Sequence, residues 1–223
     1  MAKQTIFSNK QHELLDFLIE KARNPTADIP PIPKISENLG ISSASLREQM
    51  ELAKNLGFIS AQPRKGIKIL PYEFKPAVIK SLYYAIRLDL DFFYQFSDLR
   101  NHLEKSYFLE SIKILDDKDF YKLDQLIDRA FEKLNGLPVQ IPHAEHKEFH
   151  LTIYQPINNK FLIGILESYW DIYEQVGLNL YNNLDYLKNV WDYHQKIVDK
   201  IKLKDFDDAY KLLVSHMELL DKR

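Results

Sequence analysis

Residues 35–48 read Ile-Ser-Glu-Asn-Leu-Gly-Ile-Ser-Ser-Ala-Ser-Leu-Arg-Glu and decide the fold of the first third of the chain. A short helix is predicted over Pro33–Leu39, because proline is well tolerated in the first turn of a helix. Gly40 supplies a tight turn, and a second helix is predicted from Ser42 or Ser43 to Leu56. Two helices joined by a glycine turn are typical of a helix-turn-helix motif.

The flanking segments complete this motif. Upstream, apolar residues repeat at helical spacing over 9–22, and a proline-rich loop follows. Downstream, two strand-like runs at 58–61 and 67–70 bracket Gln-Pro-Arg-Lys-Gly at 62–66, a turn with the chemistry of a hairpin. The order of helices followed by a basic hairpin predicts a winged helix-turn-helix.

From Lys75 onward, strand signals vanish and helical stripes follow one another. We therefore predict a mainly α fold, with a winged helix-turn-helix domain in residues 1–72 and an all-α bundle of about six to seven helices in residues 76–223. The helices are predicted over 77–88, 91–115, 119–134, 144–155, 160–182, 184–203 and 205–221.

Composition limits the function classes. The 223 residues contain no cysteine, which excludes disulfides, thiolate metal sites and cysteine nucleophiles. The sequence has no apolar run long enough to span a bilayer and no apolar signal region, so we expect a cytoplasmic protein without membrane contact. Residues 1–70 hold 10 basic and 7 acidic residues although the whole chain has a net charge of −2, which suits a DNA reader carried on a domain with another task.

The start of the second helix would carry the DNA contacts, because in a helix-turn-helix this helix lies in the major groove. Its serines and its arginine can reach phosphates or bases, and the hairpin adds two cations beside a glycine. The candidate DNA-binding residues are Ser42, Ser43, Ser45, Arg47, Arg64, Lys65 and Gly66.

These segments resemble the DNA-binding domain of the GntR family of transcription regulators. The resemblance covers roughly residues 10–70 and rests on 35–42, on Leu-Arg-Glu at 46–48, on Leu-Gly-Phe-Ile at 56–59 and on Gly66. The family usually has DNA-contacting arginines where this chain has Pro33 and Ser43, and only Arg47 matches. The resemblance therefore implies DNA binding, with an operator that differs from the family's usual one.

Six of the seven histidines lie beyond residue 100. His146 and His150 are four apart on a predicted helix, so they share a face and could bind one divalent ion. His194 and His216 lie beside the apolar stripes of the last two helices, where an unsatisfied imidazole is costly. Glu148 projects away from the face of His146 and His150, so the segment does not have the zinc-protease arrangement. From the residues alone, scattered core and surface histidines remain an alternative.

The helical half resembles the FCD ligand-sensing domain of the FadR branch of the GntR family. The resemblance rests on Leu-Arg-Asn-His-Leu-Glu at 99–104, on Glu-Phe-His at 148–150 followed by Asn159, on Tyr-His-Gln-Lys-Ile at 193–197 and on His216. In that family an aspartate and three histidines commonly hold a divalent metal. The matching positions here are His146, in place of the aspartate, and His150, His194 and His216.

Four neutral imidazoles suit zinc or nickel better than magnesium or calcium. Without the aspartate, the ion keeps more positive charge, so we expect a small effector that carries a carboxylate. The resemblance makes Arg100 and Asn159 candidate effector ligands. The alternatives are an ion pair with an acidic residue on a neighbouring helix for Arg100, and a helix cap for Asn159. His102 and His143 are expected to be solvated.

We therefore expect a ligand-responsive regulator, a homodimer that binds a near-palindromic double-stranded operator and that acts as a repressor, as family members usually do. One alternative is a metal-dependent enzyme of small organic acids, which would need a general base that the sequence does not mark. Another is a sensor whose winged helix no longer reads DNA.

Overall fold

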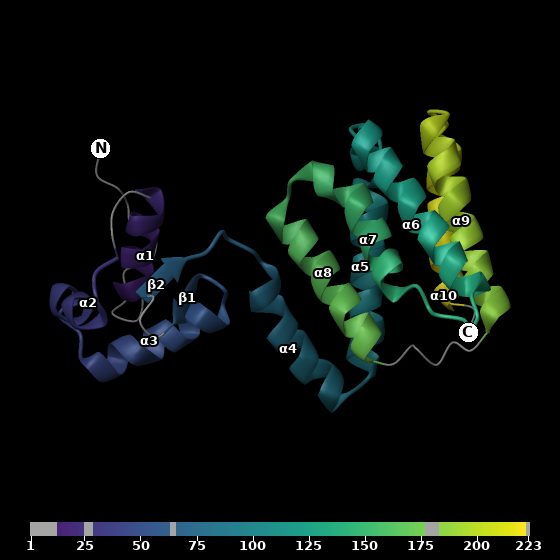
Figure 1. The fold of residues 1–223 in the computed structure, drawn as a ribbon. Coiled ribbons are helices and arrows are strands. Elements are labelled where there is room, and N and C mark those ends of the chain that lie inside the picture. The colour runs from purple at the N-terminus through teal and green to yellow at the C-terminus, as the bar shows by residue number, and fades with distance from the viewer. Residues whose placement is uncertain (1–12, 25–28, 63–65, 177–182, 222–223) are drawn as a thin grey trace. The chain divides into compact units, whose positions relative to one another are not determined.

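The computed structural model describes residues 13–24, 29–62, 66–176 and 183–221, and it divides the chain into two compact units, Met1–Ala77 and Val78–Arg223. Figure 1 shows a small first unit of helices with a two-stranded sheet, and a second unit built from long helices. The division falls inside a helix, and each unit is described by itself.

The first unit has the order of a winged helix. Gly40 ends α2 in the left-handed conformation, with φ +66°. Ser42 then caps α3, since its hydroxyl accepts a hydrogen bond from the Ser45 amide at 3.2 Å. The elements are α1 (Glu13–Arg23), α2 (Ile32–Leu39), α3 (Ser43–Asn55), β1 (Ile59–Gln62) and β2 (Gly66–Ile69). The predicted helix-turn-helix and hairpin are thus confirmed, although residues 9–12 of the first predicted helix lie outside the described residues.

A compact apolar core holds this unit together. The strands β1 and β2 pair antiparallel, with Ile59 opposite Ile69 and Gln62 opposite Gly66. Helical spacing on α3 places Leu46, Met50 and Ala53 on one buried face, whereas Leu52 is exposed. The buried core residues are Leu14, Leu18, Ile35, Leu46, Met50, Ala53 and Ile59.

The second unit is helical throughout its described residues. Its helices are α4 (Lys75–Leu88), α5 (Asp91–Ser111), α6 (Asp117–Asn135), α7 (His143–Tyr154), α8 (Lys160–Gln175), α9 (Leu184–Lys202) and α10 (Phe206–Asp221), with a short 3-10 turn, η1, at Gln155–Ile157. The mainly α fold class and the seven helical stripes are confirmed. No helix among the described residues is both long and apolar enough to cross a membrane.

Several predicted helix limits differ from the observed ones. The helix predicted over 160–182 ends at Gln175, and residues 177–182 of that prediction lie outside the described part of the chain. The helix predicted to reach residue 115 ends at Ser111. A tighter turn follows, in which the Ile114 amide donates a hydrogen bond to the Ser111 carbonyl three residues back. Asp116 then starts α6 with a reciprocal capping box that includes Asp119. The helix predicted from residue 77 begins at Lys75, since Pro76 fits the first helical turn.

The arrangement of the second unit brings α7 to its interior. Helix α7 packs on α5, α6 and α8, while α9 packs on α6 and α10. Figure 1 shows α7 among these helices, with α9 and α10 side by side. Histidines on α7, α9 and α10 can therefore meet inside the bundle.

The turn after α3 gives the first testable prediction. Gly57 has φ +74°, and a Cβ added there would lie 2.8 Å from Cγ of Pro76. Gly40 has a similar φ of +66°, but an added Cβ would meet no atom within 4 Å. Gly40→Ala should therefore cost only the left-handed strain of about 1–2 kcal/mol, and Gly57→Ala should cost more. Chemical unfolding monitored by circular dichroism measures the free energy of unfolding of both variants. Equal decreases in the two variants would contradict the prediction.

Candidate functional site

Four histidines from three helices meet inside the helical unit. His146 and His150 come from α7, His194 from α9 and His216 from α10. Each offers one ring nitrogen, and these four atoms all lie within 4.8 Å of one another. His150, His194 and His216 are buried, whereas His146 is partly exposed. The structure thus brings together the four residues that the sequence nominates as metal ligands.

The ring nitrogens fit a metal centre. Nε2 of His194 and Nε2 of His216 are 3.2 Å apart, close to the separation of about 3.3 Å that two tetrahedral ligands have when each bonds zinc at about 2.0–2.1 Å. Nε2 of His146 and Nδ1 of His194 and His216 are buried and have no hydrogen-bond partner among the described residues. One ion binds one nitrogen of each ring, so an ion held by Nε2 of His194 and His216 would also satisfy Nε2 of His146, but it would not satisfy the two Nδ1 atoms.

Burial keeps all four rings neutral. Desolvation lowers the pKa of His146, His150, His194 and His216 well below the ordinary value, and repulsion from neighbouring histidines or from Arg100 lowers it further. A neutral imidazole has the free lone pair that metal binding requires. The cluster is therefore in its ligand form at neutral pH.

A buried ion pair lies beside His150. Nε of Arg100 and Oε1 of Glu104 are 2.9 Å apart, and both side chains are almost fully buried. Nη2 of Arg100 lies 3.0 Å and Oε2 of Glu104 lies 3.1 Å from Nδ1 of His150. The guanidinium also lies 5.0 Å from the ring centroids of Tyr169 and Trp170. Desolvation raises the pKa of Glu104, and the charge of Arg100 opposes that shift.

The sequence did not nominate Glu104. Arg100 does form an ion pair, as in the alternative considered for it, but its partner is one turn away on α5 rather than on a neighbouring helix. The Arg–Glu spacing of four residues was a usable signal for that pair. The contact with His150 was not visible, because it depends on how α5 packs against α7.

Other residues fall outside the cluster. Asn159 caps α8, because its Oδ1 accepts hydrogen bonds from the backbone amides of Phe161 and Leu162. This is the helix-cap role given above as the alternative to effector binding. Glu148 points away from the histidines and pairs with Lys122 at 2.9 Å. His102 is exposed on α5, as expected.

His143 departs from its expected solvation. It is half-buried and lines a pocket of about 250 Å³ beside His146. Desolvation lowers the pKa of His143, although the charge of Glu174 opposes that shift. The spacing of three residues between His143 and His146 on one helix was the signal for this neighbourhood.

Four of the seven candidate DNA-binding residues lie at the start of α3, and the other three belong to the hairpin. Ser43 and Arg47 are exposed, Ser45 is half-buried and Ser42 is the helix cap. Gly66 starts β2 with φ +76°. The other two nominated residues, Arg64 and Lys65, lie outside the described residues.

Comparisons with known proteins agree with this architecture. The family described as FCD domain matches residues 95–219, more than half of the chain. Streptococcus agalactiae GntR has a similar structure, with a TM-score of 0.69, 14% identity and coverage of 96% of this chain and 99% of that one. E. coli McbR/YncC has a TM-score of 0.50, 18% identity and coverage of 97% and 99%. A comparison with curated proteins finds no match.

A third similar structure is Lar, described as controlling expression of the Listeria monocytogenes agr system, with a TM-score of 0.50, 16% identity and coverage of 96% of this chain and 95% of that one. The protein is therefore of the mainly α class. It has a winged helix followed by a helical bundle that contains a buried histidine cluster. The chain belongs to the family described as FCD domain, and its fold is similar to that of Streptococcus agalactiae GntR.

The buried imidazoles predict acid sensitivity of the protein stripped of metal by a chelator. The unfolded chain takes up protons below a histidine pKa of about 6.5, whereas the folded chain keeps these rings neutral. The free energy of unfolding is therefore highest above that pH. It decreases as the pH falls, by up to about 1.4 kcal/mol per pH unit for each histidine.

Urea unfolding between about pH 8 and pH 5, the window in which histidine charge changes, measures this slope. His102→Ala, which removes an exposed histidine from α5, is the control and should leave the slope unchanged. A free energy of unfolding that stays constant over this window would contradict the prediction.

Proposed function

We propose that this protein is a ligand-responsive DNA-binding transcription regulator, a cytoplasmic homodimer that represses by occupying a double-stranded operator. The observation that carries the proposal is one chain that combines a winged helix with an FCD domain whose four histidines converge on one point. Operator and effector would bind in different units, so each can change the affinity for the other.

The DNA contacts are assigned to the start of α3. Ser43 and Arg47 are exposed there, while Leu46 is buried in the core and fixes the helix orientation. Arg47 can donate two hydrogen bonds to a guanine edge or a phosphate. Because Pro33 and Ser43 stand where relatives have arginines, the operator would differ from the usual one, with Arg64 and Lys65 of the wing as further contacts.

The histidine cluster is assigned to zinc or nickel. His146, His150, His194 and His216 would hold the ion, and they are nitrogen ligands without charge. When bound, the ion supplies a Lewis-acidic positive centre that joins α7, α9 and α10. The burial of His150, His194 and His216 would keep water away from that side of the ion.

The effector is assigned to small carboxylates. Neutral ligands leave the charge of the ion uncompensated, so an anion is favoured near the cluster. Arg100 is a second candidate for this anion, although it is already paired with Glu104 at 2.9 Å. Since that pair is neutral as a whole, the ion would be the main attraction for the carboxylate.

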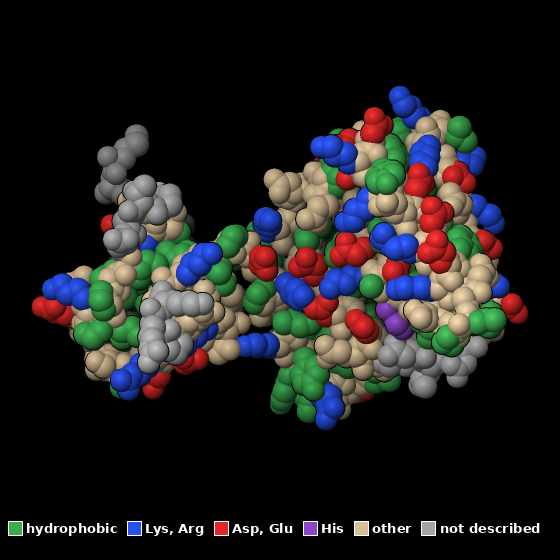
Figure 2. Space-filling view, viewed as in Figure 1, with side chains coloured by type: hydrophobic (Ala, Val, Ile, Leu, Met, Phe, Trp, Pro, Cys, Tyr) green, Lys and Arg blue, Asp and Glu red, His purple; other side chains and the backbone are tan. Residues whose placement is uncertain are grey.

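Dimer formation is supported by apolar side chains at the junction of α4 and α5. Figure 2 shows hydrophobic side chains gathered on the surface at this end of the helical unit. Such a concentration of exposed apolar side chains is typical of a surface that another protein covers. A two-fold dimer would present two winged helices to two half-sites. The exposed residues are Tyr83, Tyr84, Leu88, Leu90, Phe92 and Tyr94.

The DNA assignment is tested by fluorescence anisotropy with fragments from upstream of the coding region. Arg47→Ala should weaken binding to the preferred fragment by about tenfold to a hundredfold, since a bidentate contact is worth about 1–3 kcal/mol. The slope of log affinity against log salt should become shallower by about one.

Arg129→Ala is the matched control, because it removes the same charge from an exposed position on α6, outside the proposed dimer surface. Equal affinities of the two variants would contradict the role of Arg47. If no fragment is preferred over random DNA, with metal and with organic acids present or absent, the winged helix does not read DNA and the proposed function is wrong.

The coupling of metal to DNA is tested in the same assay. Chelation should weaken operator binding of the wild type by about fivefold or more, the lower end of typical coupling between sites, because the three helices lose their common ligand. His194→Ala should be insensitive to chelation, whereas His102→Ala should respond like the wild type. An unchanged response in His194→Ala would show that the coupling does not depend on this cluster.

A further inference from the structure

The two sides of the histidine cluster differ in access. On the side of α5, the cation of Arg100 lies 3.0 Å from Nδ1 of His150, and it stacks near Trp170. Arg100 and His150 are each only 1% exposed, so no solvent reaches the cluster past them. A metal cation approaching from that side would meet close packing, while Glu104, whose Oε2 lies 3.1 Å from Nδ1 of His150, balances the charge of Arg100.

The side of His146 is open. Of the four histidines, His146 is the one that is not fully buried. It lines the pocket of about 250 Å³ together with His143, Trp170, Tyr173 and Glu174. A second, smaller hollow is also lined by His143 and His146. Both hollows therefore lead from the surface to one member of the cluster.

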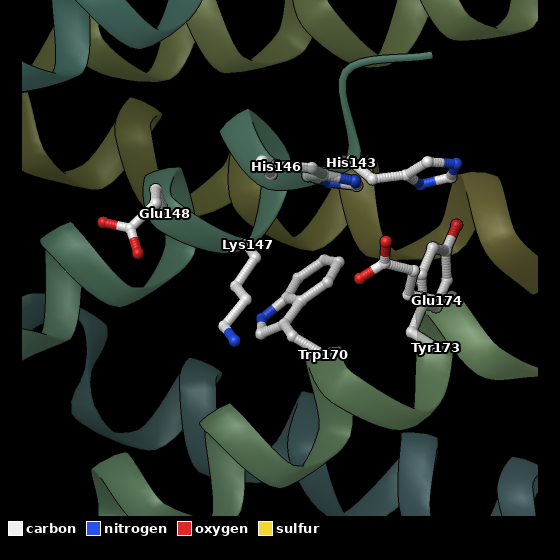
Figure 3. Close-up of a pocket in the computed structure, with 8 residues that line it drawn as sticks. His143, His146, Lys147, Glu148, Trp170, Tyr173 and Glu174 are labelled. Carbon is white, nitrogen blue, oxygen red and sulfur yellow. The ribbon is translucent and has the colours of Figure 1, made fainter.

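The lining of this pocket is suited to a cation. Figure 3 shows the rings of His143 and His146 next to each other along α7, with the Glu174 carboxylate on the side that faces them. Lys147 also borders the pocket, but its ammonium group is held by Asp171 at 2.6 Å. Outside the cluster, the pocket lining thus includes the imidazole of His143 and the carboxylates of Glu174 and Glu148, and Glu148 is paired with Lys122.

We propose that this pocket is the route by which the metal enters and leaves the cluster, and that His143 and Glu174 bind the ion transiently on the way to His146. The inference rests on the proposed metal site, because the route ends there. His143 is one helical turn before His146, so an ion held by His143 is next to the first permanent ligand. Glu174 draws the cation into the pocket.

A ligand on the route acts on rates rather than on affinity. It lowers the barrier for loading and for release alike, so the ratio of the two rates, and with it the dissociation constant, stays the same. A structural role of His143, or a role as a further permanent ligand, would change the dissociation constant instead. Kinetics and equilibrium binding together therefore separate these roles.

The test uses Co²⁺ as a coloured probe with the full chain. Stopped-flow absorbance measures the loading rate, and titration measures the dissociation constant, for the wild type and for His143→Ala, Glu174→Gln and His102→Ala. We expect loading by His143→Ala and by Glu174→Gln to slow by about tenfold, the lower end of what focusing of ions in a cleft contributes to association rates. Their dissociation constants should stay within about twofold of the wild-type value, well below one tenfold step of 1.4 kcal/mol.

His102→Ala removes an exposed histidine far from the pocket lining and should load like the wild type. Equal loading rates in His143→Ala and His102→Ala would overturn the entry route while leaving the metal site intact. A larger dissociation constant, that is, weaker Co²⁺ binding, with an unchanged loading rate would also overturn the entry route. If the wild type gives no Co²⁺ band, the metal site itself is wrong and the entry route falls with it. Circular dichroism of each variant shows that the comparison is between folded proteins.

Discussion

Four imidazole rings share one buried space, and they cannot satisfy all their nitrogens by bonding one another. Each neutral ring has one donor and one acceptor nitrogen, yet Nε2 of His146 has no partner among the described residues. Unpaired buried polar atoms cost free energy, so an apolar core would be the more stable solution for a domain without a ligand. The cluster makes physical sense as a site that is completed by a cation.

This constraint explains the surroundings of the cluster. The four histidines come from α7, α9 and α10, so an ion would join α7 to the last two helices of the chain. Glu104 balances Arg100 within α5, which keeps the region beside His150 close to neutral. An element whose packing depends on a bound ion has two arrangements, with and without it. Such an element is what a regulator requires in order to alter its hold on DNA.

Much of this could be predicted from the sequence, because helical periodicity and turn residues are local signals. Gly40 and the hairpin gave the winged helix, and the spacing of His146 and His150 gave one half of the cluster. The meeting of these two with His194 and His216 followed from a family resemblance and not from spacing. The contact of Glu104 with His150 and the place of His143 in a pocket could not be read, since both depend on how separate helices pack.

The central claim is that one ion binds all four imidazoles. X-ray absorption spectroscopy at the zinc edge, on protein loaded with one equivalent of zinc, measures the ligands directly. The account predicts four nitrogen ligands at about 2.0–2.1 Å, with the outer-shell scattering that imidazole rings give. A shell of oxygen ligands with fewer than three imidazoles, or zinc that is lost on gel filtration, would contradict it.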